Sequence, residues 1–317
     1  MKTTFLLAVV LLSASVAVAQ TLAVTHNTWS AGAPMPTARV DPSVAVLKGQ
    51  IYAVGGYNGG TLTNTEIYNP AINTWSAGVP LPTPLGDAAA AVVKNVLYVI
   101  GGTPDKQTPT NTVWAYNLKT KVWSSKAPMP TARISAAAVV EGNIIYVIGG
   151  WAGGNGLDTV ESYNPATDTW TEETPLLAGK WAPSVGLIGT KLAGYTIVAA
   201  DGAEGCCPSG FTGDSEGYNV STNTWTSLNS DPTARAFACF GTIGAQFYVA
   251  GGNDSQGPAL SVTESFKLSK NAWKTLASLP QPAIDPGSAV YKGRLYCIGG
   301  WNAWNGNYLN NVQIYQP

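Results

Sequence analysis

A glycine pair that follows an apolar run recurs five times along the chain, and a weaker sixth copy fills the one gap in the series. Successive copies are 46 to 52 residues apart. The pairs begin at Gly55, Gly101, Gly149, Gly251 and Gly299, and the weaker copy is Asp201-Gly202. Regular spacing of this size is typical of repeat architectures, in which each unit buries its apolar face against its neighbours.

Each repeat also contains a tryptophan at a fixed position and four short runs rich in Val, Ile, Tyr, Trp or Thr. The tryptophans are Trp29, Trp75, Trp123, Trp170, Trp225 and Trp273. In the first copy the runs lie near residues 42–47, 51–55, 64–68 and 73–77, each bounded by Gly, Pro or Asn. Such runs predict β-strands, and no stretch after residue 20 has a sustained helical period. Four antiparallel strands repeated radially form the blades of a propeller.

The order of Gly55-Gly56, Tyr68 and Trp75, with its spacing, resembles the kelch repeat. The resemblance covers essentially all of the chain after the first 20 residues. It implies an all-β, six-bladed kelch-type β-propeller. A fold shared by many unrelated activities says little about function.

The two ends of the chain predict how the propeller closes. The chain stops at Tyr315-Gln316-Pro317, which matches Tyr68-Asn69-Pro70, before the strand that should follow. That strand occurs at the beginning of the domain, as Asn27-Thr28-Trp29. We therefore expect one domain over residues 20–317, with three C-terminal strands and one N-terminal strand in the last blade. This arrangement removes an open sheet edge.

The first 19 residues have the pattern of a cleavable export signal. Lys2 precedes an apolar run over residues 5–18, and Ala17-Val18-Ala19 offers the small residues that signal peptidase reads. The run is shorter than the roughly 18–20 residues of a membrane-spanning helix. We expect cleavage after Ala19, a secreted or periplasmic protein, and no membrane insertion.

Export permits disulfides among the four cysteines. Cys206 and Cys207 are adjacent, whereas Cys239 and Cys297 lie far apart in apolar strands. Three pairings are open. One of them combines a vicinal Cys206–Cys207 ring with a Cys239–Cys297 bridge. Alternatively, Cys239 and Cys297 are unpaired small residues of the core.

Composition excludes several classes of function. Charged residues make up 11% of the chain and the net charge is −1, which argues against a basic nucleic-acid footprint and a polybasic membrane patch. Galactose oxidase resembles this chain in its propeller, but its copper site needs two histidines and His26 is the only one here. We expect no metal and no cofactor.

Charged residues at fixed repeat positions are interpreted as framework. One set contains Glu66, Glu161, Glu216 and Glu264, and the other Arg39, Arg133, Lys180 and Arg235. Carboxylates at one repeated position predict a structural partner, such as an arginine or a turn amide.

Aromatic residues that break the repeat are candidates for a binding site. Trp151 and Trp301 directly follow a glycine pair, Trp304 shares the second of these loops, and Trp181 begins an inner strand. With Tyr57 they should gather at one end of the propeller, where exposed rings mark binding. The alternative is that these loops pack on themselves.

Asp41, Asp87 and Asp285 share the position two residues after the arginine position. That position should point towards the channel axis in every blade. Three carboxylates there could hold a hydrated cation or sugar hydroxyls, or only accept hydrogen bonds from loop amides.

These features predict an exported, monomeric binding module that recognises a glycan or a peptide at its channel mouth. The alternative function is a carbohydrate-active enzyme, such as a sugar epimerase or mutarotase, because that reaction needs only an acid and a base. The resemblance to kelch relatives includes a six-bladed sialic acid mutarotase. The sequence shows no dedicated catalytic pair.

Overall fold

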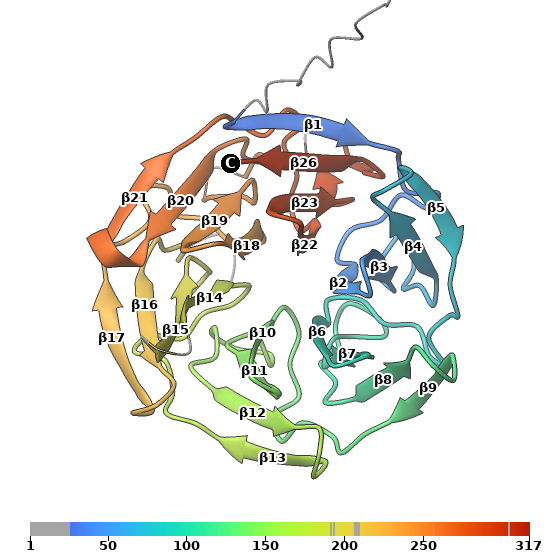
Figure 1. The fold of residues 1–317 in the computed structure, drawn as a ribbon, viewed down its shortest axis with the longest axis horizontal. Helices are drawn as coiled ribbons and strands as arrows, with labels where there is room; N and C mark the ends of the chain where they lie inside the picture. Colours follow the sequence, from blue (N-terminus) through green and yellow to red (C-terminus); the bar gives the residue numbers. More distant parts are fainter. Residues whose placement is uncertain (1–25, 191, 193, 206–209, 256, 304) are drawn as a thin grey trace, which may run out of the picture.

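The computed structural model describes residues 26–190, 192, 194–205, 210–255, 257–303 and 305–317. Within them, six four-stranded antiparallel sheets surround a central channel (Figure 1). The predicted six-bladed β-propeller is therefore confirmed. The proposed signal peptide, Cys206, Cys207 and Trp304 lie outside the described residues. No described helix has the length and apolar character needed to cross a bilayer.

Each blade runs from an inner strand at the channel to an outer strand at the rim. Blade 1 contains β2 (Ser43–Leu47), β3 (Gln50–Val54), β4 (Thr65–Asn69) and β5 (Thr74–Ala77). Blade 2 contains β6 (Ala89–Val93), β7 (Val96–Ile100), β8 (Val113–Asn117) and β9 (Val122–Ser125). Blade 3 contains β10 (Ala137–Glu141), β11 (Ile144–Ile148), β12 (Val160–Asn164) and β13 (Thr169–Glu172).

The second half repeats this plan with two variations. Blade 4 contains β14 (Ser184–Thr190), β15 (Gly194–Ala200), β16 (Ser215–Asn219) and β17 (Thr224–Leu228). Blade 5 contains β18 (Cys239–Ile243), β19 (Gln246–Ala250), β20 (Thr263–Lys267) and β21 (Ala272–Thr275), with the 3-10 turn η1 (Leu268–Lys270). Blade 6 contains β22 (Gly287–Tyr291), β23 (Arg294–Ile298), β26 (Val312–Gln316) and β1 (Thr28–Gly32), and the hairpin β24 (Trp301–Asn302) and β25 (Asn307–Tyr308) lies in its loop.

Blade 6 closes the ring as the chain ends predict. The N-terminal strand β1 pairs with β26, and Trp29 lies opposite Tyr315. The Trp29 indole donates a hydrogen bond to the Ala277 carbonyl of blade 5. Cys239 and Cys297 form a disulfide between β18 and β23, one of the pairings that the sequence leaves open. The bridge links blade 5 to blade 6.

The glycine pairs join neighbouring blades through the backbone. The Gly56 amide donates to the Leu85 carbonyl of blade 2, and the equivalent bond from Gly300 to Arg39 links blade 6 to blade 1. A Cβ on Gly55 would lie 2.1 Å from the Leu85 carbonyl oxygen, and Gly55 has a φ of +62°. Only glycine tolerates this crowding and this backbone conformation at low cost. The pairs are framework, not a phosphate-binding loop.

The repeated charged residues form buried ion pairs inside the blades. Arg39 pairs with Glu66 and Arg133 with Glu161, and the Arg39 guanidinium also donates to the Gly55 and Asn64 carbonyls. The remaining pairs are Lys180–Glu216 and Arg235–Glu264. In blade 2 the same two positions hold Leu85 and Trp114, which is why Trp114 breaks the tryptophan period. The structural interpretation of both sets is confirmed.

Candidate functional site

Six equivalent residues form a ring around the channel, one before the first strand of each blade. They all have left-handed backbones, with φ between 47° and 58°. The ring contains Asp41, Asp87, Ser135, Ala182, Phe237 and Asp285. Neighbouring ring residues are joined by backbone hydrogen bonds. For example, the Asp87 amide donates to the Asp41 carbonyl, and the Asp285 amide donates to the Phe237 carbonyl. The ring fixes where its side chains project, and aspartate tolerates this conformation better than most residues.

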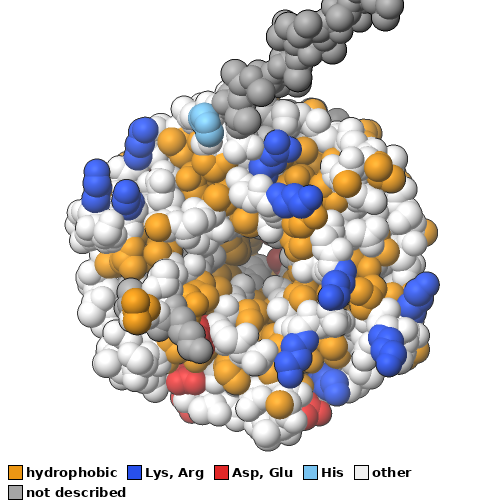
Figure 2. All heavy atoms as spheres, in the orientation of Figure 1, with side chains coloured by type: hydrophobic (Ala, Val, Ile, Leu, Met, Phe, Trp, Pro, Cys, Tyr) orange, Lys and Arg blue, Asp and Glu red, His pale blue; other side chains and the backbone are white. Residues whose placement is uncertain are grey.

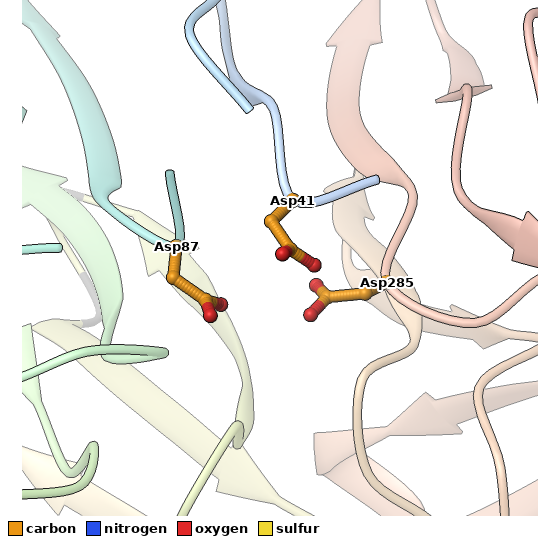
Figure 3. A group of neighbouring side chains, drawn as sticks. All are labelled: Asp41, Asp87 and Asp285. Atoms are coloured by element: carbon orange, nitrogen blue, oxygen red, sulfur yellow. The ribbon is translucent and has the colours of Figure 1, made fainter. Parts of the chain in front are cut away.

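The three aspartates of the ring meet at the channel axis. One carboxylate oxygen from each lies within 4.8 Å of the others, and Figure 3 shows the carboxyl groups of Asp41 and Asp285 pointing at each other with Asp87 facing both. The Ser135 hydroxyl donates a 2.9 Å hydrogen bond to Asp87. The structure therefore brings together the three carboxylates that the repeat position singles out. We call this group the aspartate cluster.

Lys106 supplies a cation to this cluster from the loop between β7 and β8. Its Nζ lies 2.9 Å from Asp41 Oδ2 and 4.2 Å from the centre of the Tyr57 ring. Asp105 shapes the loop by accepting hydrogen bonds from the amides of Gln107 and Thr108. The ammonium is thus held between a carboxylate and an aromatic face, an arrangement that favours its charged form.

Burial and mutual repulsion change the acidity of two members of the cluster. Burial, reinforced by the charge of Asp41, raises the pKa of Asp87 to about 7, while the Ser135 hydrogen bond and Lys106 oppose the rise. Burial and the charges of Asp41 and Asp87 raise the pKa of Asp285 well above its ordinary value. For Lys106, burial lowers the pKa but Asp41, Asp87 and Asp285 outweigh it, so the net shift is upward. The cluster therefore combines two aspartates whose protonated forms are favoured with Asp41, which lies against Lys106.

The aspartate cluster lies between two cavities. A cavity of about 560 Å³ opens at the mouth and is bounded by Lys106, Phe237, Trp301 and Tyr308 in addition to the three aspartates. A second cavity of about 360 Å³ follows the channel between the inner strands. The mouth cavity falls in the range of roughly 300–1,000 Å³ that is usual for small-ligand sites. It joins aromatic walls to a floor of hydrogen-bonding groups.

The aromatic residues divide into two groups. Trp301 is 36% exposed and lies in the hairpin β24–β25 opposite Tyr308. Tyr308 in turn contacts the Tyr57 ring at a centroid distance of 5.9 Å. Trp301 and Tyr308 bound the mouth cavity, whereas Tyr57 reaches it only through Tyr308 and Lys106. This group combines two residues predicted from the sequence with one, Tyr308, that was not.

Trp151 and Trp181 form the other group, in the loops of blades 3 and 4. Their rings stack at a centroid distance of 5.7 Å, and Trp181 meets the edge of Phe237 at 5.2 Å. Neither tryptophan is among the residues that bound the mouth cavity. They pack on each other at the same end of the molecule, and only through Phe237 do they reach the cavity wall.

Lys106 and Tyr308 are the residues that sequence reasoning missed. Lys106 lies four residues after the second glycine of its pair, where the other blades have no matching lysine. That departure from the repeat is the signal that could have found it. With Lys106 beside Asp41, the cluster already holds a cation, so its donor set fits hydroxyl groups better than a second cation.

Comparisons with known proteins agree with the architecture. Residues 22–184 match the family model described as the KLHDC2/KLHL20/DRC7 Kelch-repeats domain, and residues 234–280 and 283–317 match the Kelch motif. A solved structure described as "Structure of YjhT" superposes with a TM-score of 0.74 at 17% identity, covering 89% of this chain and 96% of that one. At this identity the superposition establishes the fold alone.

Curated relatives share the repeats over part of their length. The chain is 29% identical to Kelch-like protein terF of Aspergillus terreus over 162 residues, which are 48% of this chain and 34% of that protein. It is 25% identical to human Kelch-like protein 23 over 207 residues, 51% of this chain and 35% of that protein. The chain therefore spans about a third of the length of these relatives.

Proposed function

The chain belongs to the kelch-repeat family of β-propellers, and we propose that it binds a glycan at the mouth of its channel. Kelch propellers typically serve as protein-interaction modules, which makes recognition the expected class of activity. The kind of ligand has to be argued from the site itself.

The protonation of the aspartate cluster carries the proposal. Asp87 and Asp285 have raised pKa values, and Asp41 is paired with Lys106. The floor of the cavity can therefore donate and accept hydrogen bonds without a large uncompensated charge. Sugar hydroxyls also donate and accept, so they match such a floor. Trp301 and Tyr308 offer flat rings for the C–H face of a sugar.

A peptide is the competing ligand. A peptide arginine or lysine aimed at the cluster would have to share Asp41 with Lys106, whose ammonium lies only 2.9 Å from that carboxylate. The repulsion between the two cations would oppose entry. The site therefore favours a neutral, hydroxyl-rich group.

A glycan-array screen of residues 20–317, followed by calorimetry on the best sugar, tests the proposal. We expect Asp41→Asn to weaken sugar binding by about tenfold or more, because it removes an acceptor and releases Lys106. Asp158→Asn is the matched control, since this exposed carboxylate lies in a blade 3 loop away from the mouth cavity. Binding to peptides alone, or equal losses in both variants, would contradict glycan recognition.

A second function has its own supporting observation. The Asp285 carboxyl, whose raised pKa favours its protonated form, shares a hydrogen bond with Asp41, which places a proton donor beside a proton acceptor. We propose sugar anomerisation or epimerisation as the alternative activity. Nuclear magnetic resonance on the bound sugar separates the two functions: exchange between anomers that is accelerated by the protein and lost in Asp285→Asn indicates an enzyme, and exchange at the uncatalysed rate indicates a binding module.

We also propose that the protein is exported as a monomer with Gln20 as its first residue, on the basis of the apolar run and Ala17-Val18-Ala19. Intact mass of protein recovered from the periplasm or medium tests cleavage. A mass that includes residues 1–19 would contradict it.

A further inference from the structure

The charges of this nearly neutral chain are separated between the two ends of the propeller. We call the end opposite the mouth the basal face; it consists of the turns between the first and second strands and between the third and fourth strands of each blade. Eight exposed cations lie on these turns or directly beside them: Lys48, Lys94, Lys119, Lys121, Lys267, Lys270, Lys292 and Arg294. Among the described residues of the same turns the only side-chain carboxylates are Glu141 and Asp168, both in blade 3.

Figure 2 shows this distribution on one face of the molecule. Blue side chains extend over blades 1, 2, 5 and 6, whereas the few red ones gather over blade 3. The loops at the other end carry Asp105, Asp158, Glu204 and Asp214 as well as the aspartate cluster. Whole-chain composition could not reveal this separation.

The basal cations are not neutralised within the part of the chain that the structure describes. The ion pairs there use Arg39, Lys106, Arg133, Lys180 and Arg235, none of which is on the basal face. Arg294 donates to the amide oxygen of Gln316, and Lys292 lies over the Tyr291 ring. Both of those partners are uncharged. The face therefore keeps a positive potential that an anionic surface would complement.

The same face carries exposed apolar side chains at its turns. Leu192 is 99% exposed in the turn between β14 and β15, Ile72 is 67% exposed in the turn between β4 and β5, and Val122 is 56% exposed beside Lys121. Strands β14 and β15 have seven residues, whereas the first two strands of the other blades have five. Two further residues in each strand extend the hairpin by about 7 Å, so Leu192 lies beyond the level of the other turns.

We propose that the basal face docks the propeller on the surface of a bilayer that contains anionic phospholipid. Lysines at the turns contact the phosphate headgroups, and Leu192 enters the boundary between headgroups and acyl chains. This combination of cations and protruding apolar side chains is typical of interfacial binding without a membrane span. A nucleic acid offers no apolar layer for Leu192, and an acidic protein surface would need an apolar pocket at the matching place. Docking in this orientation leaves the mouth facing away from the membrane.

Cosedimentation of residues 20–317 with vesicles tests this proposal. We expect binding to vesicles of phosphatidylglycerol with phosphatidylcholine at low salt, and little binding to phosphatidylcholine alone. The triple variant Lys48→Gln/Lys94→Gln/Lys292→Gln should lower the partition coefficient by about tenfold or more. The control triple variant Gln107→Glu/Asn155→Asp/Ser255→Asp lowers the net charge by the same three units at exposed positions of the mouth-side loops. It keeps every basal cation and should bind like the original chain.

Leu192→Ser separates membrane docking from simple charge attraction. We expect it to weaken vesicle binding at salt concentrations that screen the lysines, because the apolar contact then contributes most of the affinity. Three results would overturn the proposal: no binding to anionic vesicles, equal losses in the two triple variants, or an unchanged affinity of Leu192→Ser. Salt-sensitive self-association in sedimentation velocity, without vesicle binding, would instead assign the basal face to the acidic mouth of a second copy.

Discussion

At the scale of single residues, the members of the aspartate cluster share a left-handed backbone and carboxyl groups that converge. The ring position demands a left-handed backbone, and Asp41, Asp87 and Asp285 meet that demand in three blades while Ala182 and Phe237 meet it in two others. Backbone conformation alone therefore does not account for carboxylates that converge at the axis. Burial raises the pKa values of Asp87 and Asp285, and the convergence of the carboxylates adds to the rise.

These pKa shifts predict how stability depends on pH. An aspartate whose pKa is raised in the folded state binds its proton more tightly when the protein is folded. Its contribution to stability is therefore lost as the pH rises through its folded-state pKa. For Asp87 the window lies between about pH 4, the ordinary value, and about 7. As the pH rises across this window, we expect the melting temperature of Asp87→Asn to increase relative to that of the original chain. If the melting temperatures of the two proteins change by the same amount between pH 4 and 8, the raised pKa is contradicted.

At the scale of elements, blade 2 has two apolar residues where four other blades have a buried ion pair. Leu85 and Trp114 occupy the positions that Arg133 and Glu161 hold in blade 3. Removing one member of such a pair leaves a buried charge without compensation, whereas replacing both by apolar groups can be nearly neutral.

This comparison predicts a non-additive pair of substitutions. Arg133→Leu alone should lower the free energy of unfolding by about 3–5 kcal/mol, because Glu161 stays buried without its cation. Arg133→Leu/Glu161→Trp should recover most of that loss, since it recreates the blade 2 arrangement. Urea unfolding measures both changes. A double variant as unstable as the single one would show that the guanidinium bonds to Gly149 and Thr159 matter more than the charge.

Prediction from sequence succeeded for the elements and for the aspartate cluster, but not for all of the loop residues around it. The glycine pairs and tryptophans recur because each blade needs the same crowded backbone and the same interblade packing, so periodicity exposes them. The walls of the mouth are built from loops that depart from the repeat, so the period does not predict where their side chains lie. Trp301 reaches the cavity whereas Trp151 stacks on Trp181, although both follow a glycine pair in the same way.

At the scale of the whole molecule, closure by β1 makes the propeller depend on its first strand. Trp29 packs on Tyr315 at a centroid distance of 5.1 Å, and Asn27 accepts hydrogen bonds from Ala277 and Tyr315. These contacts connect the N-terminal strand to blades 5 and 6.

Deleting residues 20–31 should therefore lower stability sharply. The deletion exposes the edge of β26 and removes an indole whose loss alone costs about 3–5 kcal/mol, out of a total on the order of 5–15 kcal/mol. We expect aggregation or a much lower melting temperature. Deletion of residues 20–25, which leaves β1 in place, is the control, and equal melting temperatures for the two deletions would refute the closure.

The central claim is that the mouth cavity binds the ligand, and two tryptophans of equal size test it most directly. Trp301 bounds the cavity, whereas Trp123 packs on Tyr116 and bonds to the Val79 carbonyl in the framework. Calorimetric titration of the sugar selected on the array should show that Trp301→Ala loses about 2 kcal/mol or more of binding free energy with its fold intact. Trp123→Ala should lose folding stability but bind normally when folded. Unchanged affinity in Trp301→Ala would contradict the account and direct the search to another face.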